Sequence, residues 1–287
     1  MAGDTNTDSQ RIAKPLLRLF YRAKRTVCQM PRAALELAFP PTCVACDREL
    51  TQAATNYDVL FCTSCIDELA MTTGGACPRC AAPLPVTTMP PHDDSSGDKL
   101  IAWKKIVPRD CVRCRGRRFW FHAAIAAGRY SGRLRELVLQ MKRGDRNWVS
   151  LAMGALVWKC CREQLVAAGA DVIAPVPLHW RRRMSHGTNS AALLAEVLAR
   201  RLAAPLAVGL LRRRRNTSPQ FSLTPPERRK NVRGAFAVRS RHRLEKAHVL
   251  LVDDIMTSGA TANEAARMLR QAGAKRVTVV VAARAVS

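Results

Sequence analysis

The stretch 249-VLLVDDIMTSGAT-261 is the most informative part of the chain, because an apolar run, two adjacent carboxylates and a Thr-Ser-Gly-Ala-Thr turn follow one another without a break. The apolar run predicts a buried strand and the turn predicts a helix start, whose unpaired N–H groups favour a phosphate monoester. Thr257, Ser258 and Thr261 add hydroxyl donors, and Gly259 lets the backbone approach an anion closely. The string therefore predicts a phosphate site after a strand.

The two acidic residues, Asp253 and Asp254, suggest what carries that phosphate. Ligands of open α/β sheets bind outside the carboxyl ends of the strands, and carboxylates there can accept hydrogen bonds from vicinal hydroxyls. Carboxylates beside a phosphate fit a ribose. A strand that ends in acids before a capped helix would account for Thr261 and one aspartate, but not for the whole string.

The residues around this string alternate between strand and helix patterns, which predicts an α/β fold with a parallel sheet covered by helices. Strand 248–254, helix 261–273 and strand 276–284 form a βαβ unit, expected to be right-handed. The other expected elements are helices 134–141, 151–165 and 189–202 and strand 171–177.

Two basic segments accompany the predicted sheet. In 174-APVPLHWRRRMSHGTNSAALLA-195, a strand is followed by a basic turn and a helix, so the turn residues are candidates for binding an anion: Arg181, Arg182 and Arg183. A solvated basic turn explains these arginines equally well. The proline-rich, basic segment 212–236 has the composition and length of a mobile lid.

The N-terminal part of the chain has a different composition. Residues 39–118 hold four Cys-x-x-Cys pairs and few apolar runs, so a domain boundary is expected near 118, before a domain at 119–287. Residues 84–99 are expected to form a flexible insertion. Residues 1–38 contain a basic amphipathic stretch, 11–38, which either packs on the following domain or touches a membrane surface.

Net charge and hydropathy restrict the class of protein. The chain of 287 residues carries a formal net charge of +25, which favours a polyanionic partner: nucleic acid, a phosphorylated small molecule or an anionic membrane surface. It has no apolar run of about eighteen residues and no secretory leader pattern, so no transmembrane segment and a cytoplasmic location are expected. A reducing compartment leaves its eleven cysteines available for metal.

The cysteine pairs show the spacing of zinc knuckles, in which two turns direct four sulfurs at one ion. Two structural zinc ions are therefore predicted. Pairing in sequence order gives one site from Cys43, Cys46, Cys62 and Cys65 and another from Cys77, Cys80, Cys111 and Cys114. A cross-braced pairing of the same cysteines is the alternative.

The string 253-DDIMTSGAT-261 closely resembles the ribose 5-phosphate signature of type I phosphoribosyltransferases. The resemblance implies that Asp253 and Asp254 contact the ribose hydroxyls. It implies that the phosphate is held by Thr257, Ser258, Gly259, Ala260 and Thr261. In that fold Mg²⁺ accompanies the pyrophosphate of phosphoribosyl pyrophosphate (PRPP), and the turn at 181–183 lies where the pyrophosphate loop belongs.

Together with the cysteine pairs, residues 128–145, 175–195, 217–236 and 250–261 make the chain similar to the ComF family of competence-associated, phosphoribosyltransferase-like proteins. The family usually reads Gly-Phe-Asn-Gln where this chain has 187-GTNS-190. The resemblance implies a cytoplasmic protein with a double zinc ribbon, associated with uptake of transforming single-stranded DNA.

Three functions are compatible with these features. The first is Mg²⁺-dependent phosphoribosyl transfer from PRPP to an unidentified acceptor, to which Tyr130, Lys142 and the basic lid contribute. The second is a non-catalytic module for single-stranded DNA or DNA-uptake proteins, in which aromatic residues among the basic ones stack on bases. Those residues are Trp103, Phe119, Trp120, Phe121 and Tyr130, with core packing as the alternative. The third is a regulator that senses PRPP.

Overall fold

The structure, a computed structural model, describes residues 40–50, 60–70, 75–84, 111–178, 188–215, 217, 223–239 and 244–285. The helix expected in 11–38, the insertion at 85–99 and the arginines at 181–183 lie outside these residues. The described helices are α3 (Thr63–Leu69), α5 (Gly132–Met141), α6 (Asn147–Ala168), α8 (Ser190–Leu202), α9 (Pro225–Val232) and α10 (Ala260–Gln271). The strands are β1 (Ala123–Arg129), β2 (Val172–Pro175), β3 (Leu211–Arg213), β4 (Phe236–Val238), β5 (His248–Met256) and β6 (Arg276–Arg284).

The main sheet has the order β1-β6-β5-β2, and its three strand pairs are parallel. The predicted α/β class is therefore confirmed, and β5, which carries the acidic pair, lies in the interior of the sheet. This strand runs to Met256, two residues beyond the end expected from the sequence. Strands β3 and β4 pair separately and antiparallel.

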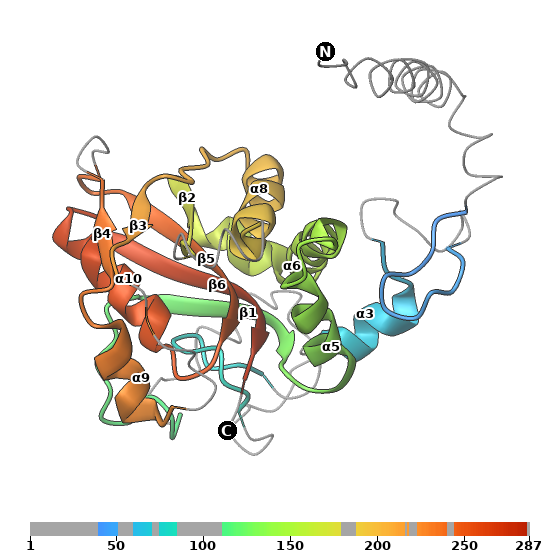
Figure 1. The fold of residues 1–287 in the computed structure, drawn as a ribbon, viewed down its shortest axis with the longest axis horizontal. Helices are drawn as coiled ribbons and strands as arrows, with labels where there is room; N and C mark the ends of the chain where they lie inside the picture. The colour runs from blue at the N-terminus through green and yellow to red at the C-terminus, as the bar shows by residue number, and fades with distance from the viewer. Residues whose placement is uncertain are drawn as a thin grey trace, which may run out of the picture.

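Alternate residues of the central strands face two different helix layers, as the period of a strand requires. Leu250 and Val252 of β5 pack with α5, α6 and α8, whereas Val249 and Leu251 pack with α10 and the β3–β4 pair. The two layers lie on opposite sides of the sheet (Figure 1). Both faces of β5 are thus covered, which leaves its carboxyl end as the accessible part.

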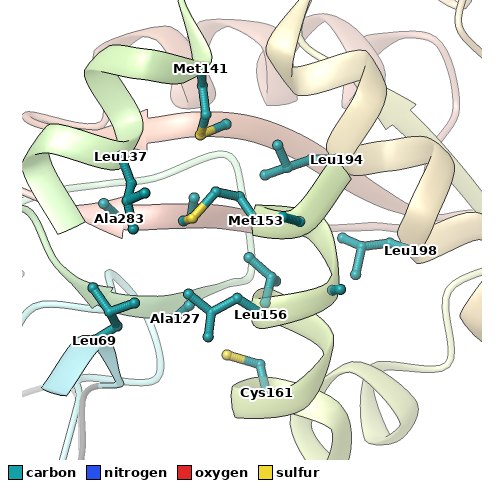
Figure 2. Packing of buried hydrophobic residues seen from close by; sticks show 14 of the residues in the cluster. Leu69, Ala127, Leu137, Met141, Met153, Leu156, Cys161, Leu194, Leu198 and Ala283 are labelled. Carbon is teal, nitrogen blue, oxygen red and sulfur yellow. The ribbon is translucent and has the colours of Figure 1, made fainter. Parts of the chain in front are cut away.

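The first cysteine-rich region shares the core of the α/β domain. Phe61 and Leu69 are buried in the same cluster as Leu137, Met153 and Leu156. Figure 2 shows Leu69 and Ala127 in this cluster with side chains from α5, α6 and α8. Docking of this region therefore stabilises the same core that positions the sheet.

The segment expected as a lid, 212–236, contains regular structure in its described residues. A capping box between Thr224 and Glu227 begins α9, with the Glu227 carboxylate accepting from the Thr224 N–H at 2.7 Å. The helix packs against α10, and the Gly234 N–H donates to Glu264 of α10 at 2.8 Å. These contacts attach the segment to the helix that follows the predicted phosphate loop.

Candidate ribose-phosphate site and metal centres

The acidic pair lies near the carboxyl end of β5, and its own backbone orients both side chains. The Asp254 N–H donates to Asp253 Oδ1 at 2.9 Å, and the Ile255 N–H donates to Asp254 Oδ1 at 2.7 Å. Each carboxylate keeps a second oxygen that these two bonds do not use. The pair can therefore accept hydroxyl donors or the water shell of a cation at the sheet edge.

A lysine lies beside one of the two carboxylates of the acidic pair. Lys142, just after α5, places its Nζ 3.5 Å from Asp254 Oδ2. Burial and the neighbouring charge of Asp254 raise the pKa of Asp253 well above its ordinary value, while Lys142 acts in the opposite direction. Because the charge of Asp253 is disfavoured by burial and only Asp254 has a cationic partner among the described residues, the site favours further cations or hydrogen-bond donors.

The loop after the acidic pair connects β5 to the N-terminus of α10. Gly259 is the N-cap of α10 with φ 77°, a left-handed conformation that favours glycine. The Ser258 Oγ accepts from the Ala260 N–H at 3.4 Å. The first turn of α10 contains no acidic residue. This helix terminus therefore lacks its own negative charge and suits a bound anion.

A buried arginine that the sequence analysis assigned only to a strand lies beneath this loop. Arg284, the last residue of β6, is only 3% exposed. Its Nη1 donates to the carbonyls of Met256, at 2.8 Å, and Thr257, and its Nε donates to the carbonyl of Cys80 at 2.8 Å. The only sequence signal for this buried position was that a cationic residue ends a Val- and Ala-rich strand, 276-RVTVVVAAR-284.

The eight paired cysteines form two groups in the described residues, and the grouping follows sequence order. One contains Cys43, Cys46, Cys62 and Cys65 and the other Cys77, Cys80, Cys111 and Cys114, with the sulfurs of each group within 4.8 Å of one another. Individual sulfur pairs are 3.7 to 3.8 Å apart. Four sulfurs at about 2.3 Å from a tetrahedral zinc ion lie about 3.8 Å apart. The donor sets therefore fit two structural zinc ions.

One cysteine in each group has a lowered pKa, whereas burial and hydrogen bonds between the thiols raise the pKa of Cys65, Cys77 and Cys114. A hydrogen bond from Cys77 lowers the pKa of Cys80 to about 5. Burial raises the pKa of Cys43, but backbone N–H groups, the first of them from Cys62, outweigh burial and lower it to about 7. Arg133 at the start of α5 donates to Cys65 Sγ at 3.3 Å. These donors suit sulfur ligands that carry negative charge.

Comparisons with known proteins agree with both parts of the chain. The phosphoribosyl transferase domain model matches residues 188–287, and the double zinc ribbon domain model matches 34–98, which excludes Cys111 and Cys114. The DNA utilization protein YhgH of Salmonella typhimurium is 30% identical over 175 residues, which are 59% of this chain and 75% of that protein. The chain belongs to the ComF family.

Other relatives carry competence names. Competence protein F of Haemophilus influenzae is 28% identical, with 80% of this ComF-family chain and 99% of that protein covered. Competence protein ComFC of Bacillus subtilis is 26% identical, with coverages of 80% and 89%.

Solved structures of phosphoribosyltransferase fold also match. The B. subtilis glutamine PRPP amidotransferase is 24% identical with a TM-score of 0.30, over 46% of this chain and 26% of that one. A purine phosphoribosyltransferase from Pyrococcus horikoshii is 17% identical with a TM-score of 0.29, over 48% and 83%.

A cavity of about 770 Å³ lies beside the loop between β5 and α10 in this ComF-family chain. Its walls come from the residues after Cys114, from α9 and from the N-terminal half of α10, and include Ser258 and Gly259 of the loop. Five arginines line it: Arg117, Arg118, Arg229, Arg233 and Arg267. Because Glu264 is the only acidic residue among the described residues that line it, the cavity has an excess of positive charge.

The aromatic residues considered for base stacking have mixed environments. Phe121 is buried and stacks on Phe119 with ring centroids 4.7 Å apart, so core packing accounts for Phe121. Phe119 also lines the arginine cavity, and Trp120 beside it is 48% exposed. Tyr130 is half-buried against the main core, and Trp103 lies outside the described residues. Phe119 and Trp120 are thus the rings placed near the cavity.

None of the described helices combines the length and apolar composition that crossing a membrane requires.

Proposed function

We propose that this chain binds PRPP or another ribose 5-phosphate group at Asp253–Thr261, and that it serves the handling of DNA during uptake. The observation that carries the proposal is the junction of the acidic pair with a loop that ends in a helix N-terminus with a glycine N-cap and no acidic residue in its first turn. The phosphoribosyl transferase match over 188–287 and the competence names of the relatives support it.

Each part of the junction has a role in this binding. The second oxygen of Asp253, and that of Asp254 beside Lys142, accept hydrogen bonds from the ribose 2′ and 3′ hydroxyls. The peptide N–H groups and hydroxyls of Thr257–Thr261 hold the 5-phosphate, and Lys142 limits the repulsion between the carboxylates and the ligand's negative charge. Mg²⁺ bound with PRPP supplies positive charge to its pyrophosphate. The basic turn at 181–183 remains a candidate for the same pyrophosphate.

The reaction that suits such a ligand is phosphoribosyl transfer. The bond between C1 of the ribose and the pyrophosphate oxygen breaks, an acceptor atom forms the new bond to C1, and pyrophosphate leaves with the electron pair. Release of pyrophosphate from PRPP in the presence of single-stranded DNA, nucleobases or amines tests this step and identifies the acceptor class.

Calorimetric titration of the zinc-loaded protein with PRPP, with and without Mg²⁺, tests the binding site. We expect Mg²⁺-dependent binding that is weakened at least tenfold in the Asp253→Asn, Asp254→Asn double variant, because hydrogen bonds to charged groups contribute about 1.5–3 kcal/mol each. Asp145→Asn, an exposed change after α5, is the control. Absence of PRPP binding by the folded wild type would reject the proposal.

A second candidate function, binding of single-stranded DNA, is favoured by the arginine-lined cavity and its neighbouring rings. Fluorescence anisotropy with a labelled oligonucleotide should give an affinity that falls steeply with salt, because each neutralised phosphate releases counterions. The Arg229→Gln, Arg233→Gln variant should lose affinity and salt dependence, whereas Arg135→Gln, at an exposed position of α5, should not. Equal losses in both variants would show that net charge alone is responsible.

A further inference from the structure

Arg284 connects two parts of the molecule that are far apart in sequence. It forms hydrogen bonds to Cys80 of the second cysteine group and to Met256 and Thr257 of the phosphate loop. The Ala285 carbonyl, at 2.5 Å, is a further acceptor. These carbonyls accept from the Nε and Nη1 of a buried guanidinium, whose donors form a fixed planar fork that no other side chain provides.

The two loop carbonyls have a consequence for the opposite side of the backbone. In a planar trans peptide the C=O and the following N–H point in opposite directions. Because the carbonyls of Met256 and Thr257 point at Arg284, the N–H groups of Thr257 and Ser258 are turned away from it. Two successive N–H groups with the same orientation form an anion-binding concavity. Arg284 thus sets the direction of two donors in the phosphate loop.

Two backbone N–H groups that follow the second zinc ribbon in sequence make further contacts. Trp120, which follows the ribbon, donates its N–H to Asn263 Oδ1 in the first turn of α10 at 2.7 Å. The Ala124 N–H donates to the Pro78 carbonyl inside the knuckle at 3.1 Å. The knuckle is therefore hydrogen-bonded to β1, the strand beside β6, as well as to Arg284.

We propose that Arg284 is a positioning residue that transmits the order of the second zinc ribbon to the phosphate loop. A zinc ion held by this cysteine group fixes the knuckle and its Cys80 carbonyl. The carbonyl fixes the guanidinium, and the guanidinium fixes the two loop peptides. The role in phosphate binding rests on the proposed function, whereas the orientation of the loop does not.

The test uses amide NMR spectra of the full-length, zinc-loaded protein with Arg284→Gln and Arg284→Lys. Arg276→Gln makes the same change at the exposed, opposite end of β6 and is the matched control. In Arg284→Gln we expect shifted or broadened Thr257 and Ser258 amides and faster exchange of the Ala285 amide, which donates to the Met256 carbonyl. Zinc content should stay at two, and Arg284→Lys should restore the spectrum in part.

Loss of the second zinc provides a readout that a merely structural role would not change. In the Cys114→Ser protein the loop amides should change as they do in Arg284→Gln, and combining both substitutions should add little. Affinity for ribose 5-phosphate should fall about tenfold in either variant. Unchanged loop amides in both folded Arg284 variants would overturn the proposal. If the wild type binds no ribose 5-phosphate while the loop amides respond, the proposed function fails and the positioning role stands.

Discussion

At the scale of single residues, Asp253 is the acid of the candidate site whose charged form is opposed by burial. Its pKa is raised by burial and by the charge of Asp254, so its ionised form is disfavoured in the folded protein. An acid whose pKa is higher in the folded than in the unfolded state loses stabilising effect as pH rises between the two values. Ionisation of Asp253 therefore lowers the free energy of unfolding near neutral pH.

We predict that Asp253→Asn has a higher free energy of unfolding than the wild type at pH 8. The difference should shrink as the pH falls toward the ordinary aspartate range, because Asp253 is then protonated in both states. Urea denaturation at several pH values measures this, with Asp145→Asn as an exposed control. A variant that is less stable than the wild type at every pH would contradict the assignment of strain to Asp253.

At the scale of elements, β1 and α5 connect the first ribbon to the sheet. Position 128 in β1 accommodates only glycine. An added Cβ would lie 2.0 Å from the Leu69 carbonyl oxygen of α3 and 2.6 Å from a Leu134 methyl carbon. At the start of α5, Arg133 contacts Cys65, and just beyond its end Lys142 contacts Asp254. One short helix thus spans from a cysteine cluster to the acidic pair.

Gly128→Ala should destabilise the protein by about 1–3 kcal/mol, because the ribbon must move away from β1 to admit a methyl group. Zinc should also be lost faster to a chelator. Gly169→Ala is the matched control, since this glycine has φ 58° with no atom within 4 Å of an added Cβ. It should cost about 1 kcal/mol through backbone strain, without faster zinc loss. Equal zinc release by the two variants would contradict this docking.

At the scale of the whole molecule, the zinc ribbons and the sheet are one structural unit. Side chains of the first ribbon lie in the main core, and the second ribbon is hydrogen-bonded to Arg284 and, through the Pro78 carbonyl, to Ala124 of β1. Metal binding then stabilises more than the knuckles themselves, because loss of the ribbons exposes apolar core surface.

Removal of zinc by a strong chelator should lower the thermal midpoint by more than about 10 °C. Several kcal/mol of binding free energy are lost, and each kcal/mol lowers the midpoint by about 2–4 °C. Circular dichroism of helix content during heating measures this. Chelator saturated with zinc is the control. An unchanged midpoint in protein shown to be metal-free would mean that the ribbons do not support the sheet.

Local patterns in the sequence predicted much of this arrangement. The strand, acidic pair, turn and helix at 249–261 are contiguous, so their order alone predicted the junction, and the cysteine spacing predicted two groups of four. Strand β1 was not predicted, because its alanines favour helices and its partner β6 is far along the chain. The contact of Arg284 with Cys80 joins residues 204 positions apart, and no local pattern encodes it.

The ribose-phosphate site is tested most directly by the crystal structure of the protein grown with saturating PRPP and Mg²⁺. We expect the 5-phosphate within hydrogen-bond distance of the N–H groups of Thr257–Thr261, and the ribose hydroxyls against Asp253 and Asp254. PRPP bound only in the arginine-lined cavity, or no bound PRPP at saturating concentration, would contradict it.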